Sequence, residues 1–112
     1  MTSRAYSSPA EFCRLDRLEL YHTGDPLLED RQLHLRLVLR PSRAGDERRL
    51  SLEFSNVRSL RFMGEMGLID LIHMLEVRPI ANHQWERCNY RVIDVEEQFL
   101  AFWCEGYEVQ HL

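Results

Sequence analysis

Residues 33–40 read LHLRLVLR, and residues 50–54 read LSLEF. In both stretches an apolar side chain stands at every second position, which is the period of a β-strand with one buried face. A helix would spread these leucines around its circumference, so the strict alternation outweighs the modest β propensity of leucine. Pro41 ends the first stretch, and residues 42–46, with Gly45, have the composition of a hairpin loop. The two stretches therefore predict an antiparallel strand pair with its leucines toward the core.

The same alternation continues on both sides of this pair. Before it, Leu18, Leu20 and His22 share one side of a predicted strand, and residues 24–26 read GDP, which is typical of a turn. After it, Asn56 offers a bend, residues 60–62 continue the extended pattern, and strands are predicted at 90–95 and 99–104 around a turn at 96–98, with residues 107–109 extending the last strand. We therefore predict an all-β, or β-rich α+β, domain: an antiparallel β-sandwich or half-barrel of about six or seven strands with at most one short helix.

Residues 64–80 leave two alternatives open. Leu68, Leu71, Ile72 and Leu75 fall at helical spacing, which predicts a short helix. Alternatively, one helical turn near 67–71 precedes a strand at 73–80, because Pro79 disfavours a helix in the residues before it. We prefer the strand.

Length and composition bound the architecture and the partners. The chain has 112 residues, of which 45% are hydrophobic and 29% charged, so we expect a flexible segment at 1–10 and a single β-rich domain at 11–112. The formal net charge of −4 argues against a protein that binds nucleic acid by neutralising phosphates. No stretch approaches the roughly 20 continuous apolar residues of a membrane span. All 14 basic residues are arginine. Two explanations are open: codon bias, or a surface suited to bidentate pairing with carboxylates.

The three cysteines, Cys13, Cys88 and Cys104, indicate free thiols. Their number is odd, and the polar N-terminal residues 1–9 lack the apolar run that export requires. We therefore expect a reducing compartment and a cytoplasmic protein. A zinc site would need Cys88 and Cys104 to converge with His111, and buried free thiols are the interpretation that we favour.

No motif in the sequence encodes a known catalytic geometry. The glycines are isolated and lack phosphate-loop spacing, and the chain contains no nucleophile elbow, paired-cysteine motif or zinc-protease helix. Cys88 with His83 and Asp94 can be drawn as a triad, but such triples arise easily in any chain that holds these residue types. We therefore predict no catalytic, cofactor-binding or metal-binding residue, and no cofactor.

Carboxylates gather toward the C-terminal end, together with a tryptophan in a polar run. Trp85 lies within HQWER at 83–87, where it is either a lid over the core or an exposed anchor for a partner, whereas Trp103 is predicted to pack across a sheet. Tryptophan and arginine are enriched at binding hot spots, and an acidic rim without a companion base favours contact over chemistry. The predicted protein-binding surface consists of Trp85, Glu86, Arg87, Asp94, Glu96 and Glu105.

The C-terminal third also carries a run of short motifs: QWE at 84–86, NYRV at 89–92, DVE at 94–96 and FWC at 102–104. This QWE…NYxVxDxE…FxC pattern resembles a family of small, mostly-β bacterial proteins of unassigned function. In size and style the chain is also similar to immunity proteins that neutralise bacterial toxins. The resemblance implies a protein partner and no known chemistry.

Three function hypotheses follow. The first is a non-enzymatic protein-binding module, most plausibly an immunity-type inhibitor of a toxin, with no nucleic acid or membrane as partner. The second is a structural subunit that homodimerises through a sheet edge. The third is a small enzyme that uses the C-terminal carboxylates, which would need a deep pocket joining Glu86, Asp94 and a histidine.

Overall fold

The computed structural model describes residues 5–25, 27–62, 74–80, 88–94 and 100–112. Within these ranges the chain contains strands and no helix. The strands are β1 (Tyr6–Ser7), β2 (Arg14–Thr23), β3 (Gln32–Arg40), β4 (Leu50–Ser55), β5 (Arg58–Phe62), β6 (Leu75–Pro79), β7 (Tyr90–Asp94), β8 (Leu100–Cys104) and β9 (Gly106–His111). The prediction of an all-β antiparallel sandwich is confirmed, although the described strands number nine rather than six or seven.

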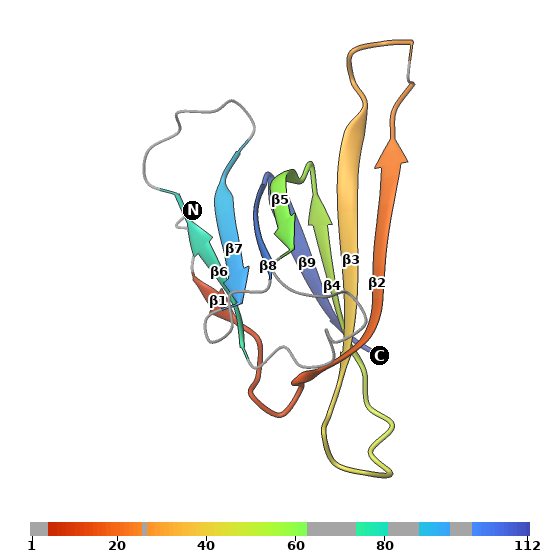
Figure 1. Cartoon of the computed structure of the whole chain (residues 1–112), viewed down its shortest axis with the longest axis vertical. Coiled ribbons are helices and arrows are strands. Elements are labelled where there is room, and N and C mark those ends of the chain that lie inside the picture. The colour runs from red at the N-terminus through yellow and green to blue at the C-terminus, as the bar shows by residue number, and fades with distance from the viewer. Residues whose placement is uncertain (1–4, 26, 63–73, 81–87, 95–99) are drawn as a thin grey trace.

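The strands form two sheets that face each other (Figure 1). The five-stranded sheet has the order β1-β6-β7-β8-β5, and the four-stranded sheet has the order β2-β3-β4-β9. Every strand pairing is antiparallel. None of the described residues belongs to a helix that is long and apolar enough to cross a membrane.

β3, which carries the leucine alternation, lies between β2 and β4 in the four-stranded sheet. Leu35, Leu37 and Leu39 are each fully buried, and Leu37 stands opposite Leu52 of β4 in the register. Residues 42–46 connect the two strands, as their composition predicts. The strand pair inferred from residues 33–54 is therefore confirmed.

The core lies between the inner faces of the two sheets. The rings of Phe54 on β4 and Phe102 on β8 meet edge to face, with their centroids 4.9 Å apart. Buried hydrophobic side chains from both sheets surround this contact: Leu35, Leu37, Leu39, Leu50 and Leu52 on one side, and Leu75, Val77, Val92 and Leu100 on the other. Burial of so many apolar groups supplies the main driving force for folding.

The chain crosses between the sheets three times: from β1 to β2 through residues 8–13, and at two short corners. At the first, Asn56 has a φ of 50°, a left-handed conformation that asparagine tolerates, and the chain passes from β4 to β5. At the second, Glu105 separates β8 from β9, and its N–H donates to the Ser55 carbonyl at 2.9 Å. Residues 107–109 therefore do not extend β8, as the sequence suggested, but belong to β9 in the other sheet, beside β4.

The N-terminal residues join the five-stranded sheet. Tyr6 and Ser7 form β1, which pairs with β6. Ser8 is buried; its N–H donates to the Leu75 carbonyl and its Oγ accepts a hydrogen bond from the Leu75 N–H, both at 2.9 Å. The segment 1–10, which we expected to be flexible, therefore contains a strand and a buried anchor.

The strand preferred for residues 73–80 is present as β6. The alternative helix falls mostly on residues 63–73, which lie outside the described residues, as do Pro26 of the predicted turn at 24–26 and the predicted turn at 96–98. Pro79 stands at the end of β6, opposite Tyr90 of β7.

Candidate functional site

The outer face of the four-stranded sheet gathers acidic and aromatic side chains from all four of its strands. The register aligns Glu19, Arg36, Glu53 and Glu108 in one row across β2, β3, β4 and β9. Tyr21 and His34 stand opposite each other in the next row. We refer to Glu19, Tyr21, His34, Glu53 and Glu108 as the acidic face.

The contacts between these side chains fix their positions. The rings of Tyr21 and His34 are stacked, with centroids 5.1 Å apart and planes inclined by 16°. The Tyr21 hydroxyl donates to the Glu53 carboxylate, and this hydrogen bond raises the pKa of Tyr21. Thr23 Oγ1 lies 2.6 Å from His34 Nε2. A partner would therefore meet a tyrosine, a histidine and a carboxylate whose rotamers are already set, which lowers the entropic cost of binding.

The acidic face is hollowed. A cavity of about 450 Å³ is lined by Tyr21, His34, Glu53, Ser55, Gly106, Tyr107 and Glu108. Gly106 helps to keep it open, because a Cβ at this position would lie only 3.2 Å from Ser55 Oγ. The hollow is wide and shallow enough to accept a side chain of another protein.

Two carboxylates of the acidic face are direct neighbours. Glu53 and Glu108 are Cα partners across β4 and β9. Like charges placed directly opposite each other on a sheet are destabilising. The Glu108 side chain is exposed and makes no hydrogen bond or ion pair with another described residue. The arrangement costs stability in the free protein and would be relieved by a cationic group from a partner.

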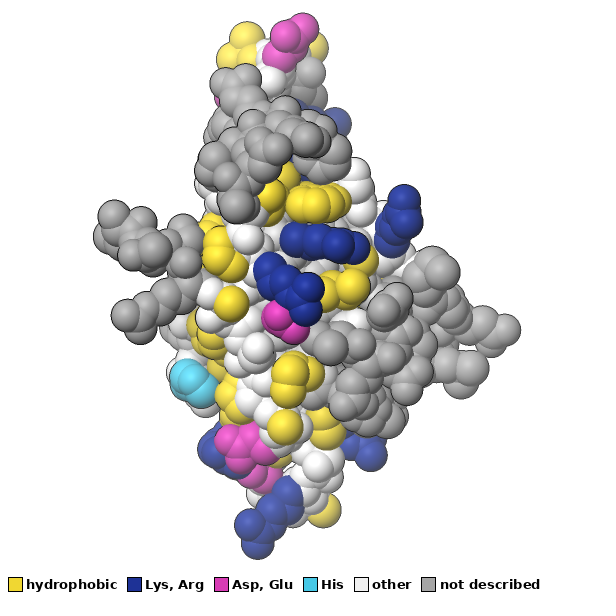
Figure 2. Space-filling view, turned by 90° about the vertical axis from the view of Figure 1, so that its left-hand side faces the viewer, with side chains coloured by type: hydrophobic (Ala, Val, Ile, Leu, Met, Phe, Trp, Pro, Cys, Tyr) yellow, Lys and Arg dark blue, Asp and Glu magenta, His cyan; other side chains and the backbone are white. Residues whose placement is uncertain are grey.

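The outer face of the five-stranded sheet carries a group of arginines. Arg58, Arg61, Arg78 and Arg91 are exposed there around Trp103, and Figure 2 shows arginine side chains side by side near the middle of this face. The Arg91 guanidinium lies 5.4 Å from the Trp103 ring centroid, and Arg78 forms an ion pair with Glu76. A hollow of about 250 Å³ lies beside Arg61, Arg91 and Trp103.

Trp103 was expected to pack across a sheet, and it is half-buried on the outer face of the five-stranded sheet. Its neighbours Phe102 and Cys104 are buried, so the two-residue period of β8 turns Trp103 to the outer face. There its ring is half covered by Arg91, a favourable cation–π arrangement.

Two of the six residues of the protein-binding surface predicted from the sequence lie among the described residues. Asp94 is fully buried at the end of β7, and Glu105 is half-buried at the corner between β8 and β9. The remaining members, Trp85, Glu86, Arg87 and Glu96, lie outside the described residues. The surface therefore stays a prediction for those four, while the Asp94 carboxylate does not reach the surface.

The two cysteines for which zinc or nucleophilic roles were weighed are buried and close together. The Asn89 N–H, next to Cys88, donates to the Cys104 carbonyl at 2.9 Å. Burial raises the pKa of the Cys88 thiol and raises that of Cys104 to about 12. Both side chains are therefore protonated thiols at neutral pH, which disfavours metal ligation and attack on a substrate. Among the described residues no group of histidine, cysteine and acidic side chains is placed to hold a metal ion.

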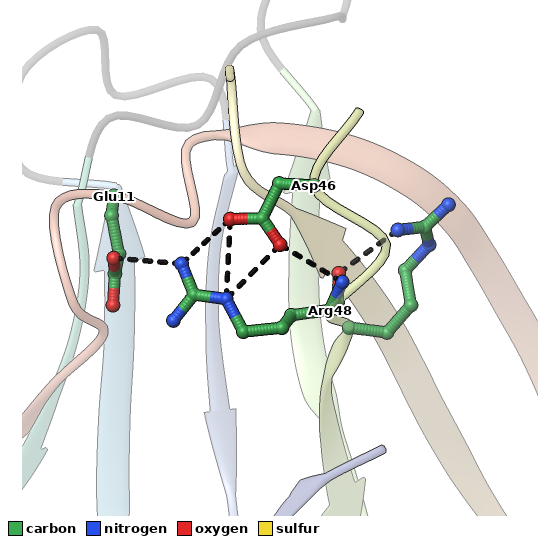
Figure 3. A network of polar contacts seen from close by, with 4 residues as sticks. Glu11, Asp46 and Arg48 are labelled. Atoms are coloured by element: carbon green, nitrogen blue, oxygen red, sulfur yellow. Dashed lines mark hydrogen bonds and ion pairs between the residues drawn. The ribbon is translucent and has the colours of Figure 1, made fainter. Parts of the chain in front are cut away.

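A third polar cluster braces the loop between β3 and β4 against the N-terminal segment. Arg48 donates to Asp46 at 2.7 Å and to Glu11 at 3.1 Å (Figure 3). These contacts lower the pKa of Asp46 to about 2 and raise that of Arg48. Because Arg48 is engaged by both carboxylates and also lies over the Phe12 ring, this cluster has a structural role.

Sequence reasoning gave Glu19, Tyr21, His34 and Glu53 no function, and it counted Glu108 among the C-terminal carboxylates without including it in the predicted binding surface. The alternation along β4 could have indicated that Glu53 points outward, since Glu53 lies between buried Leu52 and Phe54. Glu108 could not be placed beside Glu53 without knowing that β9 pairs with β4.

The fold defines a small antiparallel β-sandwich protein with charged residues on both outer sheet faces. The particular family is given by sequence comparison: a family model described as immunity protein PIM8 matches residues 2–110. The chain therefore belongs to the PIM8 family of immunity proteins. No curated protein and no solved structure matches it.

Proposed function

We propose that this chain neutralises a toxin protein by binding it stoichiometrically and without chemistry, and that the acidic face makes the contact. Membership of an immunity family implies a toxin-neutralising role and a cognate toxin as partner. The observation that carries the choice of face is the hollow in which Glu53 and Glu108 stand side by side.

The chemistry of the face indicates what the toxin presents to it. Two neighbouring carboxylates with a fixed tyrosine and histidine suit arginine or lysine side chains, which form short, charge-assisted hydrogen bonds with carboxylates. A cationic side chain in the hollow would also remove the repulsion between Glu53 and Glu108. The toxin surface is therefore basic where it meets this protein, as it would be around a site that acts on an anionic substrate.

Binding rather than catalysis fits the described side chains. The two buried thiols are held protonated, and Asp94 is enclosed in the core. On the acidic face Tyr21, His34 and Glu53 already contact neighbouring side chains, which suits a complementary surface better than a reactive centre. The buried free thiols also fit a protein that works in the reducing cytoplasm.

The test is protection of growing cells against the toxin encoded beside this gene. The two proteins are co-expressed, and growth is compared for the wild type, the double variant Glu53→Arg/Glu108→Arg and the control Glu47→Arg. Glu47 is an exposed acid on the loop between β3 and β4, away from the acidic face. We expect the wild type and the control to protect and the double variant to fail while remaining folded. Full protection by the double variant would contradict the assignment of the face.

A further inference from the structure

The hairpin of β2 and β3 projects beyond the rest of the sandwich. Leu18, near the middle of β2, still packs against the core, whereas Leu20, two residues further, is 47% exposed. Beyond it, each described residue as far as Asp30 is exposed, and the connecting loop lies past the ends of the other strands (Figure 1). The hairpin thus carries its loop away from the body of the protein.

The loop carries two solvent-exposed leucines. Leu27 is 91% exposed and Leu28 is 60% exposed. Asp25, Glu29 and Asp30 flank them, and hydrophobic and acidic side chains together form the upper end of the molecule in Figure 2. Adjacent large apolar side chains on a protruding tip are a common mark of a contact with another protein.

The loop is held in one shape by its own hydrogen bonds. The Leu28 N–H donates to the Asp25 carbonyl at 3.0 Å, and the Leu27 N–H donates to Asp25 Oδ1 at 2.9 Å. Gly24 has a φ of 89°, and a Cβ on it would lie 2.7 Å from the Asp30 carbonyl oxygen. The backbone therefore packs tightly at the base of the loop, and the leucines are presented at little entropic cost to binding.

We propose that Leu27 and Leu28 are an anchor that inserts into an apolar pocket with a positively charged rim on the toxin. This inference rests on the proposed function and names a second part of the same contact. The acids around the leucines require a cationic rim. They also oppose contact with an anionic membrane or with the same acidic loop of a second copy. Tyr21 and His34 lie on the same hairpin, so one partner can reach both the acidic face and the tip.

The experiment measures the affinity of the purified protein for the toxin encoded beside its gene. The double variant Leu27→Asp/Leu28→Asp is compared with Leu112→Asp, a matched control at another exposed leucine, which is 56% exposed. We expect the tip variant to bind roughly 10- to 100-fold more weakly, as for the loss of a hot spot, and the control to bind like the wild type. All of these positions lie outside the core, so thermal unfolding should stay unchanged.

A second variant, Gly24→Ala, keeps both leucines but forces the base of the loop to move. We expect it to weaken binding several-fold, because the anchor is no longer held in its binding conformation. If Leu27→Asp/Leu28→Asp binds the toxin as tightly as the wild type does while Glu108→Arg binds weakly, the leucines are not an anchor. The proposed function would then remain intact. Failure of the wild type itself to bind this toxin would overturn both.

Discussion

Cys88 and Cys104 show how burial decides the chemistry of a residue. Cysteine at the sequence level is compatible with metal binding, nucleophilic attack or simple packing, and only the environment separates these roles. Cys88 is 2% exposed and Cys104 is fully buried, and their thiols have raised pKa values. Cys13, by contrast, is half-buried. The structure therefore separates one accessible thiol from two enclosed ones.

This difference is measurable with a thiol reagent. In the native protein at pH 8 we expect Cys13 to react within minutes and Cys88 and Cys104 to react only as fast as the protein opens. In denaturant all three should react at once. A Cys13→Ser variant should lose the fast phase and keep the slow one. Rapid modification of Cys88 or Cys104 in the folded protein would show that the two thiols are accessible after all.

At the scale of the elements, the alternation of apolar and polar residues along each strand led to the correct strand predictions. The errors arose where strands far apart in the sequence pair with each other. The alternation at 33–40 and 50–54 correctly predicted an antiparallel strand pair. The position of β9 could not be predicted, because residues 107–109 have the same local pattern whether they extend β8 or cross to the other sheet. Trp103 lies between buried Phe102 and Cys104, so the two-residue period gives its outward direction.

The acidic face could not be predicted either, because it also depends on pairing between strands far apart in the sequence. Each acidic residue of the face lies in a predictable outward position, but its neighbours come from strands far apart in the sequence. The row that joins Glu19 of β2 to Glu108 of β9 spans most of the chain. Sequence reasoning instead grouped acids that are close in the chain, and Asp94 proved to be buried while Glu105 lies at a corner.

The short strand β1 offers a test at this scale. Ser8 satisfies the Leu75 backbone N–H from a fully buried position. We expect Ser8→Ala to lower the free energy of unfolding by about 1–3 kcal/mol, because it leaves a buried donor without its acceptor. Ser42→Ala, in an exposed loop, should change it by less than about 0.5 kcal/mol. Denaturant unfolding measures both, and equal stabilities would mean that β1 contributes little to the fold.

At the scale of the whole molecule, where the net charge is −4, charged side chains are divided unevenly between the two outer faces. On the four-stranded sheet Glu53 and Glu108 stand side by side, while Arg36 lies in the same row and Arg17 pairs with Glu19. The five-stranded sheet presents arginines around Trp103. A divided surface of this kind orients an approaching partner and accelerates its association. The acidic face and the hairpin tip belong to the same sheet, so a single toxin domain can cover both.

The most direct test of this account is a calorimetric titration of the cognate toxin with the purified wild type, Glu108→Arg and Glu47→Arg, at low and high salt. We expect one-to-one binding for all three, with Glu108→Arg weaker on the order of 100-fold and Glu47→Arg unchanged. The difference should shrink at high salt, since exposed charges are then screened. Equal affinities for the three proteins would contradict the acidic face as the contact. A toxin inactivated by far less than an equimolar amount of the protein would contradict neutralisation by binding.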